Sequence, residues 1–245
     1  MVKLIARSGK KEHKVVSEKE WLTARKRFLV KEKKFTRLRD QLNVERRKLP
    51  WAKVEKEYVF EGPDGKESLG DLFGRKRQLI VQHFMFGPGW GEGCPHCSFW
   101  ADHWDAALVH LAARDTALVV VSRAPFKEIK PFKKRMGWRF KWVSSFGSEF
   151  NFDYHVSFTP EEIRSGKLFY NYRITRMKID EREGFSVFYK DPNGDVFHTY
   201  STYERGLDLM NTAYNLLDLT AKGRDEDPEH TQDWVRYHDR YQRKG

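Results

Sequence analysis

Short apolar segments alternate with longer amphipathic segments between residues 79 and 145. The runs 79–86 and 117–122 are short and partly β-branched, which is typical of buried strands. The segment 96–113 contains neither Gly nor Pro, and we expect a helix over about 95–113. A second helix is expected at 125–136, because Pro125 can begin it and Gly137 can end it. A short strand follows at 142–145.

Two further strands, at 185–190 and 195–201, flank the turn Asp191-Pro192-Asn193-Gly194 and predict a β-hairpin. A weaker hairpin pattern covers residues 58–69. We expect a helix at 203–219 and a short last helix at 234–241. The aromatic, polar stretch 146–176 matches no regular element, and we expect an insertion or lid there.

A long amphipathic helix is predicted for residues 17–49. Ser17 and Glu20 form a capping-box pattern at its start, and Pro50 ends it. Apolar residues recur every seven positions along it: Trp21, Phe28, Phe35, Leu42 and Leu49. Such a narrow stripe resembles a coiled-coil seam and needs burial. We therefore expect this helix to join the chain into a homo-oligomer or to pack across the body.

The net charge of +11 lies entirely in the N-terminal part of the chain. Residues 1–57 contain 19 Lys and Arg against 8 Asp and Glu, which leaves residues 58–245 neutral. Opposite charges interleave on the helix, which indicates a solvated face rather than a nucleic-acid site. We divide the chain into a basic helical extension, 1–57, and a domain, 58–245.

No apolar run is long enough to cross a bilayer, and residues 1–14 lack the apolar core of a secretory signal. We therefore expect a cytoplasmic protein that does not bind membranes. In that compartment disulfides are usually transient, so a cysteine pair there suggests redox chemistry.

The two cysteines occur as Cys94-Pro95-His96-Cys97, directly after the glycine-rich segment that follows the first apolar run. Proline is tolerated in the first turn of a helix, so we expect the helix to begin at about Cys94. Free backbone N–H groups and the helix dipole then favour a Cys94 thiolate, whereas Cys97 lies one turn inside. The spacing predicts a dithiol redox site, with Cys94 attacking and Cys97 resolving.

Several neighbours are candidates to support this pair. Protonated His96 can stabilise the thiolate, and Glu92 acts in the opposite direction. Trp90 can line an apolar rim, and Asp102 follows Cys94 by a little over two helical turns, on about the same face. His198 is a weaker candidate for a proton donor or third ligand. A structural zinc site would need two more ligands than the cysteines supply, and we expect no cofactor.

The order of strands and helices around the motif predicts a thioredoxin-like α/β fold. The stretch 85–102 resembles the domain of unknown function (DUF) family 899. Further stretches carry the same resemblance: 110–116, 134–138, 143–148, 197–203, 205–208 and 217–220. This resemblance covers nearly the whole chain. It implies a three-layer thioredoxin-like fold with a mixed central sheet and an activity as a dithiol–disulfide oxidoreductase.

Two positions depart from ordinary thioredoxins. Gln82, with His83 beside it, takes the place of a buried aspartate on the first central strand. No proline lies near Gly184 or Phe185, where thioredoxins have a cis-proline that helps to hold the substrate backbone. Substrate recognition should therefore differ, and the insertion after Ser145 is a candidate to take over that role.

The leading hypothesis is thiol–disulfide exchange with protein or small-molecule thiols and disulfides. Three alternatives remain open: peroxide reduction by Cys94, a copper or other soft-metal site made by the two thiolates and His198, and a redox-inactive binding module. The reduction potential of the cysteine pair in metal-free protein would separate them best.

Overall fold

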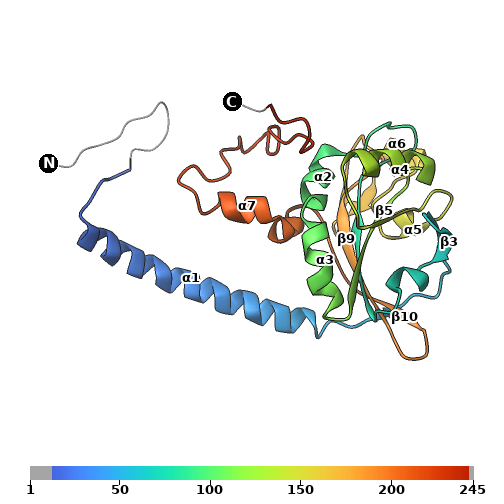
Figure 1. Cartoon of the computed structure of the whole chain (residues 1–245), viewed down its shortest axis with the longest axis horizontal. Coiled ribbons are helices and arrows are strands. Elements are labelled where there is room, and N and C mark those ends of the chain that lie inside the picture. Colours follow the sequence, from blue (N-terminus) through green and yellow to red (C-terminus); the bar gives the residue numbers. More distant parts are fainter. Residues whose placement is uncertain (1–12, 243–245) are drawn as a thin grey trace. The chain divides into compact units, whose positions relative to one another are not determined.

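The computed structural model describes residues 13–242. Eight of its strands form one mixed sheet in the order β1-β10-β9-β4-β5-β6-β2-β3. Figure 1 labels β3, β5, β9 and β10 of this sheet. The strands of this sheet are β1 (Ala52–Lys53), β2 (Val59–Gly62), β3 (Gly65–Ser68), β4 (Gln78–His83), β5 (Thr116–Ser122), β6 (Lys141–Ser144), β9 (Gly184–Lys190) and β10 (Val196–Thr202).

Strand β4 is the centre of this sheet. It pairs in parallel with β5, from Gln78↔Thr116 to His83↔Val121, and antiparallel with β9, from Gln78↔Tyr189 to His83↔Gly184. Strand β6 continues the parallel side, and β10 completes the predicted hairpin with β9. The order β10-β9-β4-β5, with the cysteine helix directly after β4, is that of a thioredoxin-like fold. The predicted mixed central sheet is confirmed.

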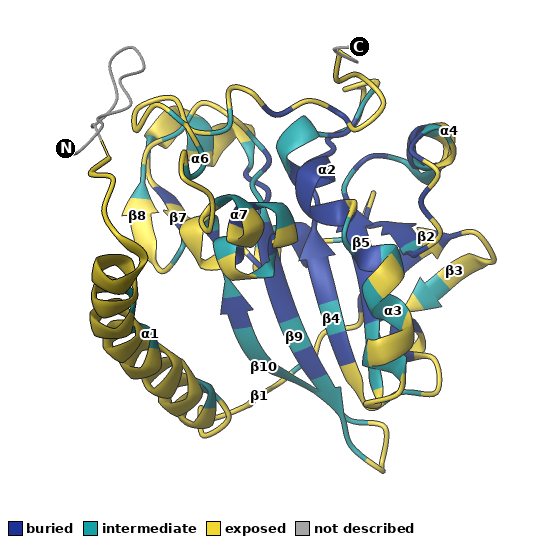
Figure 2. Ribbon diagram, turned by 60° about the vertical axis from the view of Figure 1, so that its left-hand side comes forward, coloured by how far each residue is buried: buried dark blue, intermediate teal, exposed yellow. Residues whose placement is uncertain are grey.

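The helices lie on both faces of the sheet. One face is covered by α2 (Pro95–Ala101), α3 (Trp104–Ala112) and α4 (Phe126–Arg135), and the other by the 3₁₀ turn η1 (Asp71–Phe73) and α5 (Phe150–Asp153). Successive side chains of β4 point to opposite faces. Ile80 joins the core under α2, whereas Leu79 and Val81 join the core under α5. In Figure 2 the end of β4 next to α2 is coloured as buried.

The segment that sequence analysis marked as an insertion contains α5, α6 (Pro160–Ser165), and the two-stranded sheet of β7 (Leu168–Tyr170) and β8 (Arg173–Thr175). Its residues 156–158 lie alongside residues 180–182. Phe158 N–H donates to Asp180 O at 3.0 Å, and Arg182 N–H donates to Val156 O at 2.7 Å. The insertion therefore supports the chain that leads into β9.

Three helix predictions need correction. The predicted helix 95–113 is divided into α2 and α3, and Asp102, at the end of α2, accepts hydrogen bonds from Trp138 and His238. The predicted helix 203–219 is a 3₁₀ helix, η2 (Glu204–Met210), followed by α7 (Thr212–Leu217), because Asn211 caps a new start. The predicted helix at 234–241 is wrong: those residues form turns, and Trp234 and Tyr237 bond to distant groups.

Residues 1–49 and 50–245 are separate compact units. The described part of the first unit is dominated by α1 (Glu18–Arg46), whose start at Ser17 is confirmed. Ser17 Oγ accepts a bond from Glu20 N–H, and the Glu20 carboxylate accepts one from Ser17 N–H. Taken by itself, α1 buries none of its side chains. In the second unit, β1 pairs with β10, so residues 52–53 belong to the sheet. Within the described residues, no helix combines the length and apolar character of a membrane span.

Candidate functional site

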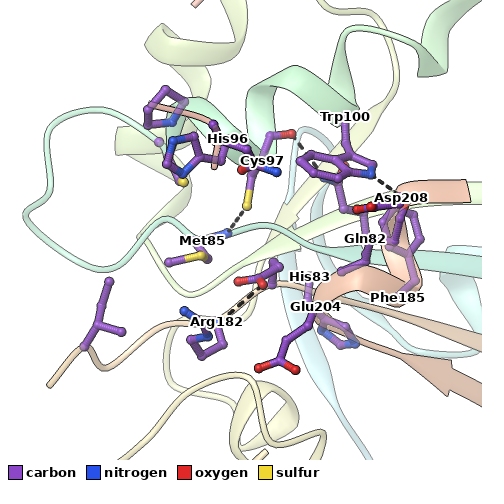
Figure 3. Close-up of a pocket in the computed structure, with 18 of the residues that line it drawn as sticks. Gln82, His83, Met85, His96, Cys97, Trp100, Arg182, Phe185, Glu204 and Asp208 are labelled. Atoms are coloured by element: carbon purple, nitrogen blue, oxygen red, sulfur yellow. Dashed lines mark hydrogen bonds and ion pairs between the residues drawn. The ribbon is translucent and has the colours of Figure 1, made fainter. Parts of the chain in front are cut away.

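A cavity of about 680 Å³ opens at the carboxyl end of β4, beside the start of α2. Its walls come from five parts of the second unit. Three of them are the segment 82–85 of β4 and its continuation, the glycine-rich segment with the first turn of α2, and the chain entering β9. The other two are the segments 204–208 and 231–237. Both cysteines line it. In Figure 3, Arg182 and Glu204 lie across this cavity from His96.

The first cysteine is held by its backbone. Cys94 is the N-cap residue of α2, Pro95 follows in the first turn, and Cys94 N–H donates to Met85 O at 2.9 Å. Gly93 packs so closely that a Cβ there would lie 2.5 Å from the Phe84 ring and 2.9 Å from that of Phe132. Only glycine fits at this position, and this fixes the chain just before the sulfur.

The two thiols have pKa values shifted in opposite directions. The pKa of Cys94 is well below its ordinary value, because its sulfur accepts a hydrogen bond from the Cys97 thiol, another from His96 and one from the Cys97 backbone N–H. These contacts outweigh burial, which alone would raise it.

Cys97 is buried, and its pKa is well above the ordinary value. Burial is the largest cause, and the neighbouring Cys94 and the charge of Glu183 act in the same direction. Met85 N–H donates to Cys97 Sγ at 3.4 Å (Figure 3) and partly opposes them. Within the pair, the thiolate form is therefore favoured at Cys94 and the thiol form at Cys97, and neither cysteine is in a disulfide.

His96 supplies positive charge beside the thiolate. Its pKa is raised by the hydrogen bond that it donates to Cys94, and a bond to the backbone oxygen of Gln232 and the charge of Glu183 add to this. Burial opposes the shift. The His96 ring therefore bonds both to Cys94 and to a carbonyl from the C-terminal segment, and these contacts favour its protonated form.

Gln82 lies on β4 beneath the cysteine helix. Its Oε1 accepts a hydrogen bond from Trp104 Nε1 at 2.6 Å, and its Nε2 donates to Cys97 O at 3.3 Å. The residue is buried and uncharged. It cannot take a proton from Cys97. The carboxylate whose charge acts on Cys97 is that of Glu183, from the chain before β9.

His83 points away from α2, yet also lines the cavity. A chain of hydrogen bonds joins His83 Nε2, Ser186 Oγ, Ser201 Oγ and His198 Nε2 at 2.8, 2.8 and 2.7 Å. His198 Nε2 also bonds to Tyr200 O at 3.1 Å. Burial, and secondarily His198, lower the pKa of His83 to about 3. His198 therefore contacts Ser201 rather than the cysteines.

The wall of the cavity includes the segment where thioredoxins have a cis-proline and this sequence has none. Gly184 and Phe185 line it, and no peptide bond is cis in the described part of the chain. A Cβ at Gly184 would lie 2.6 Å from the Tyr203 ring. Phe185 packs edge-on against Trp104 with ring centroids 5.5 Å apart.

The predicted supporting residues separate into two groups. Trp90, Glu92, Pro95 and His96 line the cavity with the cysteines. The Glu92 carboxylate is paired with Arg135 and Arg240, which reduces its effect on the thiolate. Asp102 does not line the cavity: it accepts bonds from Trp138 Nε1 at 2.8 Å and His238 Nδ1 at 2.6 Å.

Sequence analysis missed several polar residues of the cavity, among them Arg182, Glu183, Glu204 and Gln232. The only available signal was the position of Arg182 and Glu183 just before the predicted strand 185–190. Among residues 13–242, no group of three or more His, Cys, Asp and Glu side chains is arranged to hold a metal ion.

Three solved structures show what the chain is similar to. Peroxiredoxin Q of Xanthomonas campestris is 14% identical, with a TM-score of 0.42 over 64% of this chain and 86% of that one. Peroxidoxin BcpB of Mycobacterium tuberculosis is 12% identical, with a TM-score of 0.38 over 63% and 85%. A candidate protein disulfide isomerase of Bacteroides thetaiotaomicron is 17% identical, with a TM-score of 0.37 over 73% and 94%. No curated protein matches the chain.

A match to a family model identifies the family of the chain more specifically than these structural similarities do. The model described as "Bacterial protein of unknown function (DUF899)" matches residues 10–241. The match covers both the N-terminal helix and the domain with the cysteines, and it confirms the resemblance carried by the stretch 85–102 and its companions. The chain belongs to this family.

Proposed function

We propose that this chain is a thiol–disulfide oxidoreductase in which Cys94 attacks and Cys97 resolves. The observation that carries the proposal is the opposite shift of the two pKa values within one hydrogen-bonded pair at a cavity. The thiolate is the nucleophile in disulfide exchange, and a buried thiol is protected until it is needed.

The reaction balances with a disulfide as the second reactant. Cys94 Sγ⁻ attacks one sulfur of the substrate, a mixed disulfide forms, and the first thiolate leaves. Cys97 then loses its proton and attacks Cys94 Sγ, and the second thiolate leaves with a proton available to it. Two electrons pass from the cysteine pair to the substrate, and the reverse sequence oxidises a dithiol.

The low pKa of Cys94 also bears on direction. A stabilised thiolate favours the reduced pair, which makes the corresponding disulfide a stronger oxidant. His96 contributes to this, because its hydrogen bond to Cys94 lowers the pKa of that thiol.

Single serine variants test the proposal. Cys97→Ser should leave a reactive thiolate that traps a mixed disulfide, and Cys94→Ser should leave a sluggish thiol that traps none. In the wild type, oxidation should remove two hydrogens by mass spectrometry, and a dithiol reductant should restore them. Equal trapping by both variants would overturn the roles. Rapid sulfenic acid formation with peroxide in Cys97→Ser, without disulfide exchange, would instead favour a peroxidase.

We place this activity in a reducing cytoplasm, in a homo-oligomer formed through the basic extension 1–57, without nucleic-acid or membrane partners. The neutral charge of residues 58–245 supports the last point, because the cysteine domain offers no excess of positive charge to phosphates.

A further inference from the structure

The charged pair Arg182–Glu183 in the cavity wall has unused bonding capacity. Arg182 Nη2 lies 3.5 Å from Glu183 Oε1, which is long for a charge-assisted hydrogen bond. Arg182 Nε is buried and has no hydrogen-bond partner within residues 13–242. The guanidinium lies over the Tyr170 ring, 4.9 Å from its centroid, so its plane is held in place. The Arg182 side chain also bonds to Tyr170. Arg182 therefore lines the cavity as a positioned cation whose donors are not all used by Tyr170 and Glu183.

The other acidic side chains of the wall are better satisfied. Glu204 accepts bonds from Asn171 at 2.6 Å and from Arg173 at 3.2 Å. Asp208 is paired with Arg224 at 2.8 Å. The Glu183 carboxylate bonds to Tyr170, and its ion pair with Arg182, at 3.5 Å, is longer than those of Glu204 and Asp208.

The backbone beside the cysteines is closed to an incoming strand. A peptide can bind by adding a strand only where N–H and C=O groups are free. Here Asp180 O accepts from Phe158 N–H, Arg182 N–H donates to Val156 O, and Glu183 O accepts from Tyr170 OH at 2.9 Å. The insertion occupies the edge that a protein substrate would use.

We infer that the cavity binds a small disulfide built from amino acids, with a carboxylate at Arg182 and an ammonium group at Glu183, rather than a protein chain. The volume of about 680 Å³ lies in the range of small-molecule sites, about 300–1,000 Å³. Because Arg182 lies across the cavity from His96 in Figure 3, a bound molecule can contact this pair while its sulfur faces Cys94.

This inference rests on the proposed exchange reaction and uses its balance. One substrate sulfur bonds to Cys94 and the other leaves as a thiolate, after which Cys97 displaces the second. Arg182 and Glu183 exchange no electrons or protons in these steps; they hold the substrate.

The test uses the full chain, reduced, with four small disulfides and one protein disulfide. Cystine carries both charges, cystamine only ammonium groups, dithiodipropionate only carboxylates, and hydroxyethyl disulfide neither; insulin is the protein substrate. Each rate of oxidation of the cysteine pair is divided by the rate of the same reagent with N-acetylcysteine. We expect the ratio for cystine to exceed that for hydroxyethyl disulfide at least tenfold, and insulin to give the lowest ratio.

Variants separate the two halves of the site. Arg182→Gln should lower the cystine and dithiodipropionate ratios about tenfold more than the hydroxyethyl disulfide ratio, and Glu183→Gln should do the same for cystine and cystamine. Arg139→Gln is the matched control: Arg139 is exposed and pairs with Asp105, outside the cavity, so no ratio should change. Circular dichroism identifies a variant that fails to fold. In that case the ranking of the five disulfides by the wild-type ratios tests the inference by itself.

The outcomes distinguish the two proposals. Equal ratios for all small disulfides, or a ratio for insulin at or above that for cystine, would overturn the substrate inference and leave disulfide exchange standing. If no disulfide oxidises the pair faster than it oxidises N-acetylcysteine, the proposed function itself fails.

Discussion

Gln82 joins the central strand to the cysteine helix by donating a hydrogen bond to Cys97 O at 3.3 Å while it accepts one from Trp104 at 2.6 Å. An uncharged amide thus occupies the position directly beneath the resolving cysteine. The buried Trp104 N–H depends on it, and the carboxylate charge that influences Cys97 comes instead from Glu183, in the chain before β9.

Gln82→Leu should lower the free energy of unfolding by about 1–3 kcal/mol, because it leaves the buried Trp104 N–H without a partner. Urea denaturation of reduced protein measures this. In the Gln82→Leu/Trp104→Phe double variant the donor is gone as well, so the combined loss should be smaller than the sum of the two single losses. Strict additivity would show that the bond contributes little.

His96→Gln should raise the pKa of Cys94, because the cationic donor beside the thiolate is lost. Cys97→Ala should raise it further, since the Cys97 thiol is the largest cause of the shift. The rate of alkylation of Cys94 as a function of pH reports both midpoints. Unchanged midpoints in the two variants would mean that the helix start, rather than these side chains, sets the thiolate.

The buried His83 should make stability depend on pH. Its folded pKa of about 3 lies below the ordinary value of 6.5, so the unfolded state takes up the proton first. The contribution is complete above pH 6.5 and is lost as the pH falls towards 3. Between pH 6.5 and pH 5 the wild type should therefore lose about 2 kcal/mol more stability than His83→Gln, at about 1.4 kcal/mol per pH unit.

Denaturant titrations at the two pH values measure this difference. His230→Gln, at an exposed histidine, is the matched control and should follow the wild type. If His83→Gln loses as much stability as the wild type over this interval, His83 is not the group that titrates on unfolding.

Removal of residues 1–49 should lower the oligomeric state. The apolar stripe of α1, which repeats every seven positions, needs a partner, because its side chains are unburied within their own unit. Light scattering of the intact and shortened chains measures the mass. A salt-dependent affinity for DNA or RNA in the intact chain, absent from the shortened one, would contradict assembly as the role of this helix.

Most of the central fold was predictable because its signals are local. The strands around residues 79–86 and 117–122, and the hairpin around Asp191–Gly194, follow from apolar runs and turn residues. The division between α2 and α3 was not predictable, because no Gly or Pro marks it. Asp102 instead bonds to Trp138 and His238, which are distant in sequence. The missing helix at 234–241 has the same cause: Tyr237 bonds to Gly93 instead.

The candidate site was predictable to the same extent. Cys94, Pro95, His96 and Cys97 form one contiguous motif, so their proximity needs no tertiary information. Arg182 and Glu183 reach the cavity only because β9 pairs with β4 and the insertion supports the chain before it. Periodicity indicates which face of an element is buried, but not which loops meet at its end.

The hydrogen bond from Tyr237 OH to Gly93 O, at 2.6 Å, joins groups 144 residues apart in the sequence. Chains grow at about 5–20 residues per second, so roughly 7–30 s separate the synthesis of the cysteines from that of this wall of their cavity. A similar interval separates the synthesis of His96 from that of Gln232, to whose backbone it bonds. The nascent chain therefore carries its cysteine pair through most of its synthesis before the bonds that cover the pair can form. These thiols are thus open to reaction earlier in the life of the protein than the finished fold suggests.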